Sequence, residues 1–246
     1  MKIFIDSADL KEIQKYLSWG ICDGVTTNPT ICLKCGVSGG KKGIRERIIE
    51  IARLIHPRPV SVEVTTDRVE DVVAQAKEYS GWAENIAVKV TITDRQGSSL
   101  LPAVYRLVSE GVRVNVTAMT TYNQAILAAK AIKAGQEKCP QAKIPSFVSV
   151  FAGRISEEQG TEQAFQVLGN VREWLDFHEF QGVEIIVGSI RSRENVELWS
   201  QSGAHVLTIP PQIISQCLVS ARTKETVAQF LGDAQKALEG LGNKDS

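Results

Sequence analysis

The chain has 246 residues, of which 43% are hydrophobic and 23% are charged, and its 28 basic residues balance its 28 acidic ones. This composition is typical of a soluble globular protein long enough to bury a sizeable core. The net charge of zero excludes a global attraction to nucleic acid or to a membrane surface, so any anion selectivity has to come from local groups. We expect one domain over residues 1–246, with no nucleic-acid partner and no membrane partner.

The N-terminal sequence MKIFIDSADL has an aspartate within its short apolar run, which argues against a signal peptide. No run of about 18 apolar residues is present, so we expect no membrane span. The five cysteines are odd in number and scattered, which favours reduced thiols over a disulfide framework. These features together predict a cytoplasmic protein.

Short apolar segments rich in β-formers alternate with longer helical patterns along the chain. Strands are predicted at residues 2–6, 23–27, 60–64, 86–90, 113–117, 147–151, 183–188 and 205–209. Helices are predicted at residues 8–18, 41–55, 67–80, 98–110, 121–134, 156–178, 192–202 and 211–220, with an extra C-terminal helix at 223–240.

Apolar strands that alternate with helices form parallel sheets buried on both faces. Eight such units predict the α/β class and a closed (β/α)8 TIM barrel, with a doubly wound open sheet as the alternative. The usual nucleotide-binding loops, GxGxxG and GxxxxGK[ST], are missing. The glycine-rich segment 36–43 and the polar segment 135–146 are predicted to be loops.

Polar residues interrupt the predicted strands or follow them directly. In a (β/α)8 barrel the carboxyl ends of the strands meet at one face, where the chemistry takes place. Each polar residue also has a structural interpretation, as a helix cap, a turn former or an ion-pair partner. The residues of this set are Asp6, Thr26, Thr27, Asn28, Glu63, Lys89, Asn115, Thr117, Ser149, Arg154, Ser189 and Arg191.

Lys89 is the most informative of these residues, because it is the only charge in the apolar strand Ile86–Val90. A buried ammonium costs several kcal/mol unless it is paired or neutralised. Burial favours the neutral amine, which is the nucleophilic form. An ion pair with Glu63 is the structural alternative, and the convergence of polar groups from seven strands favours catalysis.

The residue types predict Schiff-base chemistry. A neutral Lys89 amine can attack a ketose carbonyl and form an iminium, which acts as an electron sink for cleavage of the C3–C4 bond. Asp6 is the candidate base for the C4 hydroxyl, and Glu63 with Thr117 could hold the water that this chemistry needs. Asn28, Asn115 and Ser149 suit the ketol hydroxyls. Arg154 and Arg191, together with Ser189, suit a terminal phosphate, because arginine presents a planar fork of donors.

Several segments carry a resemblance to a known family. They are FIDSADLKEI, DGVTTNPT (23–30), VSVEV (60–64), AVKV (87–90), NVT with NQAILAAKA (115–131), SVFAGRI (149–155) and VGSIR (187–191). With them the chain resembles the small transaldolase family, which includes fructose-6-phosphate aldolase, over roughly residues 1–235.

The resemblance implies a transferase of carbohydrate metabolism, of the kind found in the pentose phosphate pathway, with no metal and no organic cofactor. It implies Lys89 as the Schiff-base residue, Asp6 as general acid and base, and Glu63 with Thr117 on the catalytic water. The implied substrate-binding residues are Thr27, Asn28, Asn115, Ser149, Phe151, Arg154, Ser189 and Arg191. Sugar phosphates are the implied substrates, and a pentamer or decamer, with 223–240 reaching a neighbour, is the implied assembly.

Two positions bear on the branch of the family. Glu63 and Phe151 are of the transaldolase type, whereas the aldolase branch typically has Gln and Tyr there. They favour transfer of dihydroxyacetone from a donor such as fructose 6-phosphate or sedoheptulose 7-phosphate to an aldose. Departures at Val90-Thr91, at Thr120–Tyr122 and in the long 135–146 loop border the site mouth. The alternatives are an aldolase that releases free dihydroxyacetone, a transaldolase for a non-standard phosphorylated or sulfonated ketose, and a non-catalytic sugar-phosphate-binding barrel.

The pair Cys32 and Cys35 forms a CxxC motif, for which redox or zinc chemistry is the functional alternative. A zinc site would need two more ligands at suitable spacing. We therefore expect ordinary thiols and no metal site.

Overall fold

Eight parallel strands close into a barrel in the computed structural model of the chain, which describes residues 1–139 and 145–242. The strands pair in chain order, and β8 pairs with β1 to complete the ring. They are β1 (Lys2–Asp6), β2 (Gly24–Thr26), β3 (Val60–Glu63), β4 (Ile86–Thr91), β5 (Val114–Met119), β6 (Ser146–Val150), β7 (Val183–Val187) and β8 (Val206–Ile209). The predicted (β/α)8 barrel and its eight strands are confirmed, and the open-sheet alternative is excluded.

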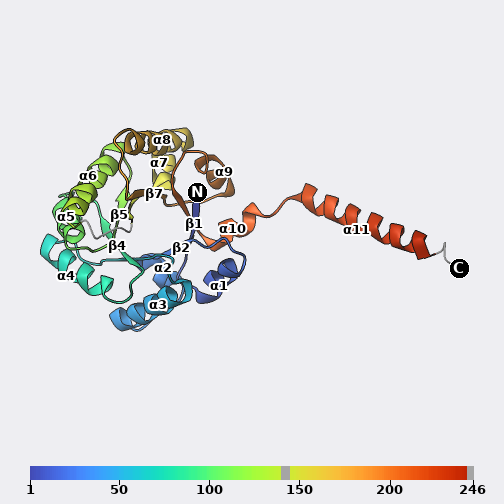
Figure 1. Cartoon of the computed structure of the whole chain (residues 1–246), viewed down its shortest axis with the longest axis horizontal. Helices are drawn as coiled ribbons and strands as arrows, with labels where there is room; N and C mark the ends of the chain where they lie inside the picture. Colours follow the sequence, from blue (N-terminus) through green and yellow to red (C-terminus); the bar gives the residue numbers. More distant parts are fainter. Residues whose placement is uncertain (140–144, 243–246) are drawn as a thin grey trace.

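The helices connect successive strands and surround the barrel (Figure 1). They are α1 (Leu10–Ser18), α2 (Pro29–Lys34), α3 (Gly40–Ile55), α4 (Val69–Ser80), α5 (Leu101–Ser109), α6 (Tyr122–Lys138), α7 (Ala152–Gln159), α8 (Thr161–Phe177), α9 (Arg193–Trp199), α10 (Pro211–Cys217) and α11 (Ala221–Gly242). None of the described helices is both long enough and apolar enough to cross a membrane.

Two helical predictions need correction. The short helix α2 was not predicted, although Asn28 caps it and Pro29 opens it. The predicted helix 156–178 is in fact two helices, α7 and α8, which meet at Gly160. The φ angle of Gly160 is +94°, a value that helical backbone does not adopt and that glycine tolerates.

The two predicted loops are also shorter than expected. Helix α3 begins at Gly40, inside the predicted loop 36–43, and helix α6 continues to Lys138, inside the predicted loop 135–146. Residues 140–144 of that second loop lie outside the described residues.

The barrel interior changes from apolar to polar along the strands. A separate buried cluster fills one part of it, and its members are Phe4, Ala87, Phe147, Ile186 and Val206. Side chains two residues apart in a strand point to the same face. The next inward positions on four of these strands are therefore Asp6, Lys89, Ser149 and Thr208. The apolar cluster closes the amino-terminal end, and polar groups gather at the carboxyl ends.

Helix α11 stands clear of the barrel (Figure 1). This helix confirms the predicted C-terminal helix 223–240. Its large apolar side chains Val227, Phe230, Leu231 and Leu238 are 48–71% exposed. Their spacing of three, four and seven residues places them on one face of the helix.

Candidate active site

A cavity of about 480 Å³ opens at the carboxyl ends of the strands. All of the predicted site residues line it except Thr27 and Asn115. Its lining residues are Asp6, Thr26, Asn28, Pro29, Thr30, Ile31, Lys34, Glu63, Lys89, Thr117, Ala118, Ser149, Phe151, Arg154, Gly188, Ser189, Arg191 and Thr208. The topology thus brings side chains from distant parts of the chain to one cavity.

Lys89 is buried in the barrel interior, where it is 4% exposed. Its strand neighbour in register is Glu63, and Lys89 Nζ lies 3.5 Å from Glu63 Oε2. The same ammonium donates a hydrogen bond of 3.3 Å to the Thr27 carbonyl oxygen. The ion pair between Lys89 and Glu63, which the sequence offered as the structural interpretation of Lys89, is therefore present. Both residues line the cavity, so the same contact also allows a proton to pass between them.

Asp6 lies at the end of β1 and faces the same cavity. Thr26 Oγ1 donates a hydrogen bond of 2.6 Å to Asp6 Oδ1. Burial raises the pKa of Asp6 above its ordinary value, while the charge of Lys89 and the Thr26 hydrogen bond act in the opposite direction. A carboxyl in a cavity with a raised pKa is suited to accept and return a proton during a reaction.

Asn115 is buried behind the residues that line the cavity. Its Nδ2 donates to Ser61 Oγ at 3.0 Å, and its Oδ1 accepts from Ser149 Oγ at 2.7 Å. Thr27 is similarly committed, because its hydroxyl donates to the Ser61 carbonyl oxygen at 2.8 Å. The side chains of both residues are therefore bonded within the protein, and Thr27 contacts Lys89 through its backbone carbonyl oxygen. Ser61, which the sequence analysis missed, is the residue that joins them.

Two further predicted residues keep polar groups available to a ligand. Asn28 Oδ1 accepts from the Ile31 backbone N–H and caps α2, which leaves the Asn28 Nδ2 group for other contacts. Thr117 Oγ1 is buried and has no hydrogen-bond partner among the described residues. An unpaired buried hydroxyl is costly, so a bound water or substrate oxygen would satisfy Thr117.

The two predicted phosphate-binding arginines share an acidic partner. Arg191 Nη1 lies 2.5 Å from Glu157 Oε1, and Arg154 Nη1 lies 3.6 Å from Glu157 Oε2. Arg191 Nη2 also donates to Ser189 Oγ at 3.5 Å. Both guanidinium groups therefore converge on one place at the cavity rim.

Gly153 explains how this rim is assembled. An ideal Cβ at this position would lie 1.8 Å from the Ser189 carbonyl oxygen. Only glycine permits the start of α7 to approach the loop after β7 so closely. This contact places Arg154 beside Ser189 and Arg191.

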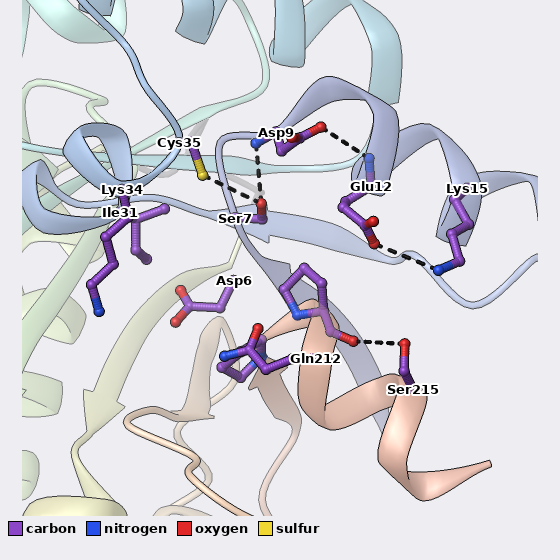
Figure 2. A pocket seen from close by; sticks show the side chains of 12 residues that line it. Asp6, Ser7, Asp9, Glu12, Lys15, Ile31, Lys34, Cys35, Gln212 and Ser215 are labelled. Carbon is purple, nitrogen blue, oxygen red and sulfur yellow. Dashed lines mark hydrogen bonds and ion pairs between the residues drawn. The ribbon is translucent and has the colours of Figure 1, made fainter. Parts of the chain in front are cut away.

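A second cavity of about 470 Å³ adjoins the first, and the two share Asp6, Ile31 and Lys34. Figure 2 shows the side chains of Asp6, Lys34 and Gln212 projecting into it. Lys34 was missed by the sequence analysis because α2 was not predicted. Its positive charge acts on Asp6, whose pKa it lowers slightly against the effect of burial.

All five cysteines are free thiols, as expected, and Cys35 contacts Ser7 rather than a second sulfur. Residues 1–139 and 145–242 contain no cluster of histidine, cysteine, aspartate or glutamate side chains arranged to hold a metal ion.

Comparison with known proteins identifies the family of the chain. The family model described as "Transaldolase/Fructose-6-phosphate aldolase" matches residues 3–244. The chain belongs to this family.

Relatives of similar length support the same assignment. A "Probable transaldolase" of Streptococcus agalactiae serotype V is 36% identical over 233 residues, which cover 95% of this chain and 97% of that one. Proteins with the same description from Symbiobacterium thermophilum and Thermoplasma acidophilum are 33% and 34% identical, and each alignment covers 96% of this chain. The two alignments cover 98% and 96% of the length of those relatives.

A solved structure of thiamine phosphate pyrophosphorylase from Pyrococcus furiosus is similar in fold. The TM-score is 0.54 at 9% identity, over 85% of each chain. At this identity the likeness concerns the barrel fold alone.

Proposed function

We propose that this member of the family is a transaldolase, which transfers a dihydroxyacetone unit from a ketose phosphate to an aldose through a Schiff base on Lys89. The observation that carries the proposal is the position of Lys89. It is buried in the barrel, 3.5 Å from Glu63, in a cavity that also contains Asp6.

The first half of the reaction forms and cleaves the covalent adduct. Glu63 takes a proton from the Lys89 ammonium, and the neutral amine attacks C2 of the ketose. Loss of water gives the iminium. Asp6 then accepts the proton of the C4 hydroxyl, and the C3–C4 bond breaks. The C4 fragment leaves as an aldose phosphate, and the electron pair of the broken bond moves onto the iminium to form an enamine on Lys89.

The second half reverses these steps with a new aldehyde. The enamine C3 attacks the acceptor carbonyl, and Asp6 returns its proton to the new hydroxyl. A water between Glu63 and Thr117 then attacks C2 and releases the product from Lys89. The unpaired Thr117 Oγ1 supports this role, because it has a free hydrogen-bonding position inside the cavity.

The anionic end of the substrate binds at the rim. Arg154 and Arg191 supply forked N–H donors there, and Ser189 adds a hydroxyl. These donors suit a phosphate and also a sulfonate. Comparing fructose 6-phosphate with its 6-sulfonate analogue as donors distinguishes the two anions, and we expect the phosphate to be used.

Transfer and simple release differ in their need for an acceptor. Glu63 and Phe151 favour transfer, and both line the cavity. We expect turnover of fructose 6-phosphate to require an aldose phosphate such as erythrose 4-phosphate, and to be lost in Lys89→Met. A comparable rate without any acceptor would instead support an aldolase, and full activity in Lys89→Met would refute the mechanism.

We also propose that the protein is a cytoplasmic homo-oligomer in which α11 packs against a neighbouring copy. The support is the apolar face of α11, which leaves Phe230 65% exposed and Leu231 67% exposed. The pentamer or decamer implied by the resemblance stays a prediction about the number of copies.

Light scattering after size exclusion tests this assembly. Phe230→Glu should reduce the mass of the particle toward that of a monomer. Gln229→Glu, which adds the same charge on the opposite face of α11, should leave the mass unchanged. An unaltered mass in Phe230→Glu would refute the role of α11.

A further inference from the structure

The side chain of Asp6 is held by two hydroxyl groups from neighbouring strands. Thr26 Oγ1 donates to Asp6 Oδ1 at 2.6 Å, and Thr26 Oγ1 is also hydrogen-bonded to Thr208 Oγ1. Thr26 and Thr208 are 1% and 5% exposed. The sequence analysis assigned no role in the reaction to either residue.

The barrel closure brings these three residues together. Asp6 is in register with Thr26 on β2, while β8 pairs with the other edge of β1. The three side chains therefore come from the first, second and last strands, and they meet only when the ring is closed.

The number of protons fixes the direction of this chain of hydrogen bonds. A threonine hydroxyl has one proton to donate. When Asp6 is ionised, the hydroxyl of Thr26 donates its one hydrogen bond to the carboxylate. Thr26 can then only accept a hydrogen bond from Thr208. The order is then Thr208 to Thr26 to Asp6, with both protons directed toward the negative charge.

This arrangement also selects which carboxylate oxygen reacts. Asp6 Oδ1 is occupied by Thr26, and Asp6 Oδ2 has no hydrogen-bond partner within the described part of the chain. The free oxygen is available to the cavity, which Asp6 lines. A carboxylate that is fixed in this way presents one oxygen to the C4 hydroxyl.

We infer that Thr208 is a positioning residue for Asp6 and that it acts through Thr26. This inference rests on the proposed function, because it assumes that Asp6 transfers a proton during catalysis. Thr208 lies on β8, and the mechanism expected from the sequence assigned no role to any residue of this strand.

The test compares variants that separate the hydroxyl of Thr208 from its shape. Thr208→Val keeps the shape and removes the donor, and we expect kcat to fall about fivefold, as for the loss of one neutral hydrogen bond, with KM little changed. Thr208→Ser keeps the donor and should restore most of kcat. The acid limb of the kcat–pH profile should move to higher pH in Thr208→Val, because the carboxylate loses stabilisation of its charged form.

A double-mutant cycle tests whether Thr208 acts through Thr26. Thr26→Val should lower kcat about tenfold or more, since it removes a hydrogen bond to a charged group. Adding Thr208→Val to that variant should then have no further effect. Ser146→Ala removes a buried hydroxyl at the opposite end of the barrel and should leave kcat and the pH profile unchanged.

Three results would overturn the inference: a wild-type pH profile in Thr208→Val, equal losses in Thr208→Val and Thr208→Ser, or additive losses in the double variant. Each rate is divided by the amount of protein whose Lys89 borohydride traps with fructose 6-phosphate. This normalisation counts only folded, substrate-binding protein, so a partly unfolded variant can still be compared with the wild type. Thr208→Ala serves as a second variant if Thr208→Val does not fold. If no adduct is trapped on the wild type, the proposed function is refuted. If an adduct is trapped and the Thr208 variants behave like the wild type, only the positioning role of Thr208 is refuted.

Discussion

Glu157 lies between the two arginines that are proposed to bind the substrate anion, and its removal gives a quantitative prediction. Its carboxylate is 2.5 Å from Arg191 Nη1 and 3.6 Å from Arg154 Nη1. A substrate phosphate that binds both guanidinium groups has to displace this carboxylate. Glu157 is therefore expected to compete with the substrate.

The size of the effect follows from the exposure of these side chains. The arginine side chains are 47% and 59% exposed and that of Glu157 is 45% exposed, so water and salt screen both ion pairs. Exposed pairs contribute about 0–1 kcal/mol. If displacing Glu157 costs about 1 kcal/mol, Glu157→Gln should lower KM about fivefold, since about 1.4 kcal/mol corresponds to a factor of ten.

Steady-state kinetics with fructose 6-phosphate at low ionic strength measure this change, with inorganic phosphate as a competitive inhibitor. KM and the inhibition constant should fall together while kcat stays constant, and the difference should shrink at high salt. Glu158→Gln is the matched control, because Glu158 is exposed and has no ion-pair partner among the described residues. A KM that is unchanged or higher in Glu157→Gln would show that Glu157 does not compete, and a higher value would mean that it holds the arginines in place.

Two further predictions, the second with a matched control variant, concern the electrostatics and the packing of the site. Because burial raises the pKa of Asp6, the folded protein binds its proton up to a higher pH than the unfolded chain does, so ionised Asp6 destabilises the fold at neutral pH. Asp6→Asn should therefore raise the unfolding temperature at pH 7 and lose this advantage below about pH 4, where both states are protonated; a lower unfolding temperature at pH 7 would contradict the argument. Gly153→Ala should destabilise by about 1–3 kcal/mol and raise KM for phosphorylated ketoses, because the new Cβ meets the Ser189 carbonyl oxygen. Gly169→Ala, in α8 with no atom within 4 Å of the new Cβ, should instead stabilise by about 0.5–1 kcal/mol in chemical denaturation, and equal effects of the two would refute the steric account.

The barrel could be predicted from sequence because each strand is a short apolar run between helical patterns. The polar exceptions on these strands led to Lys89, Asp6 and Glu63, which the structure brings into one cavity. Lys89 was recognisable by contrast, as the only charged residue in an apolar strand.

The missed features depend on contacts between distant segments. Helix α2 has only six residues, too few to show a helical period, and Lys34 was missed with it. Thr208 is one hydroxyl in an apolar strand, and its contact with Thr26 exists only because β8 closes against β1. The burial of Asn115 behind the cavity likewise depends on Ser61 and Ser149, and no local pattern reveals it.

The central claim is that Lys89 forms the Schiff base. Borohydride reduction in the presence of fructose 6-phosphate, followed by peptide mapping by mass spectrometry, tests it directly. The account predicts a reduced dihydroxyacetone adduct on Lys89 and no adduct in Lys89→Met. An adduct on another lysine, or no adduct with any ketose phosphate or sulfonate, would contradict it.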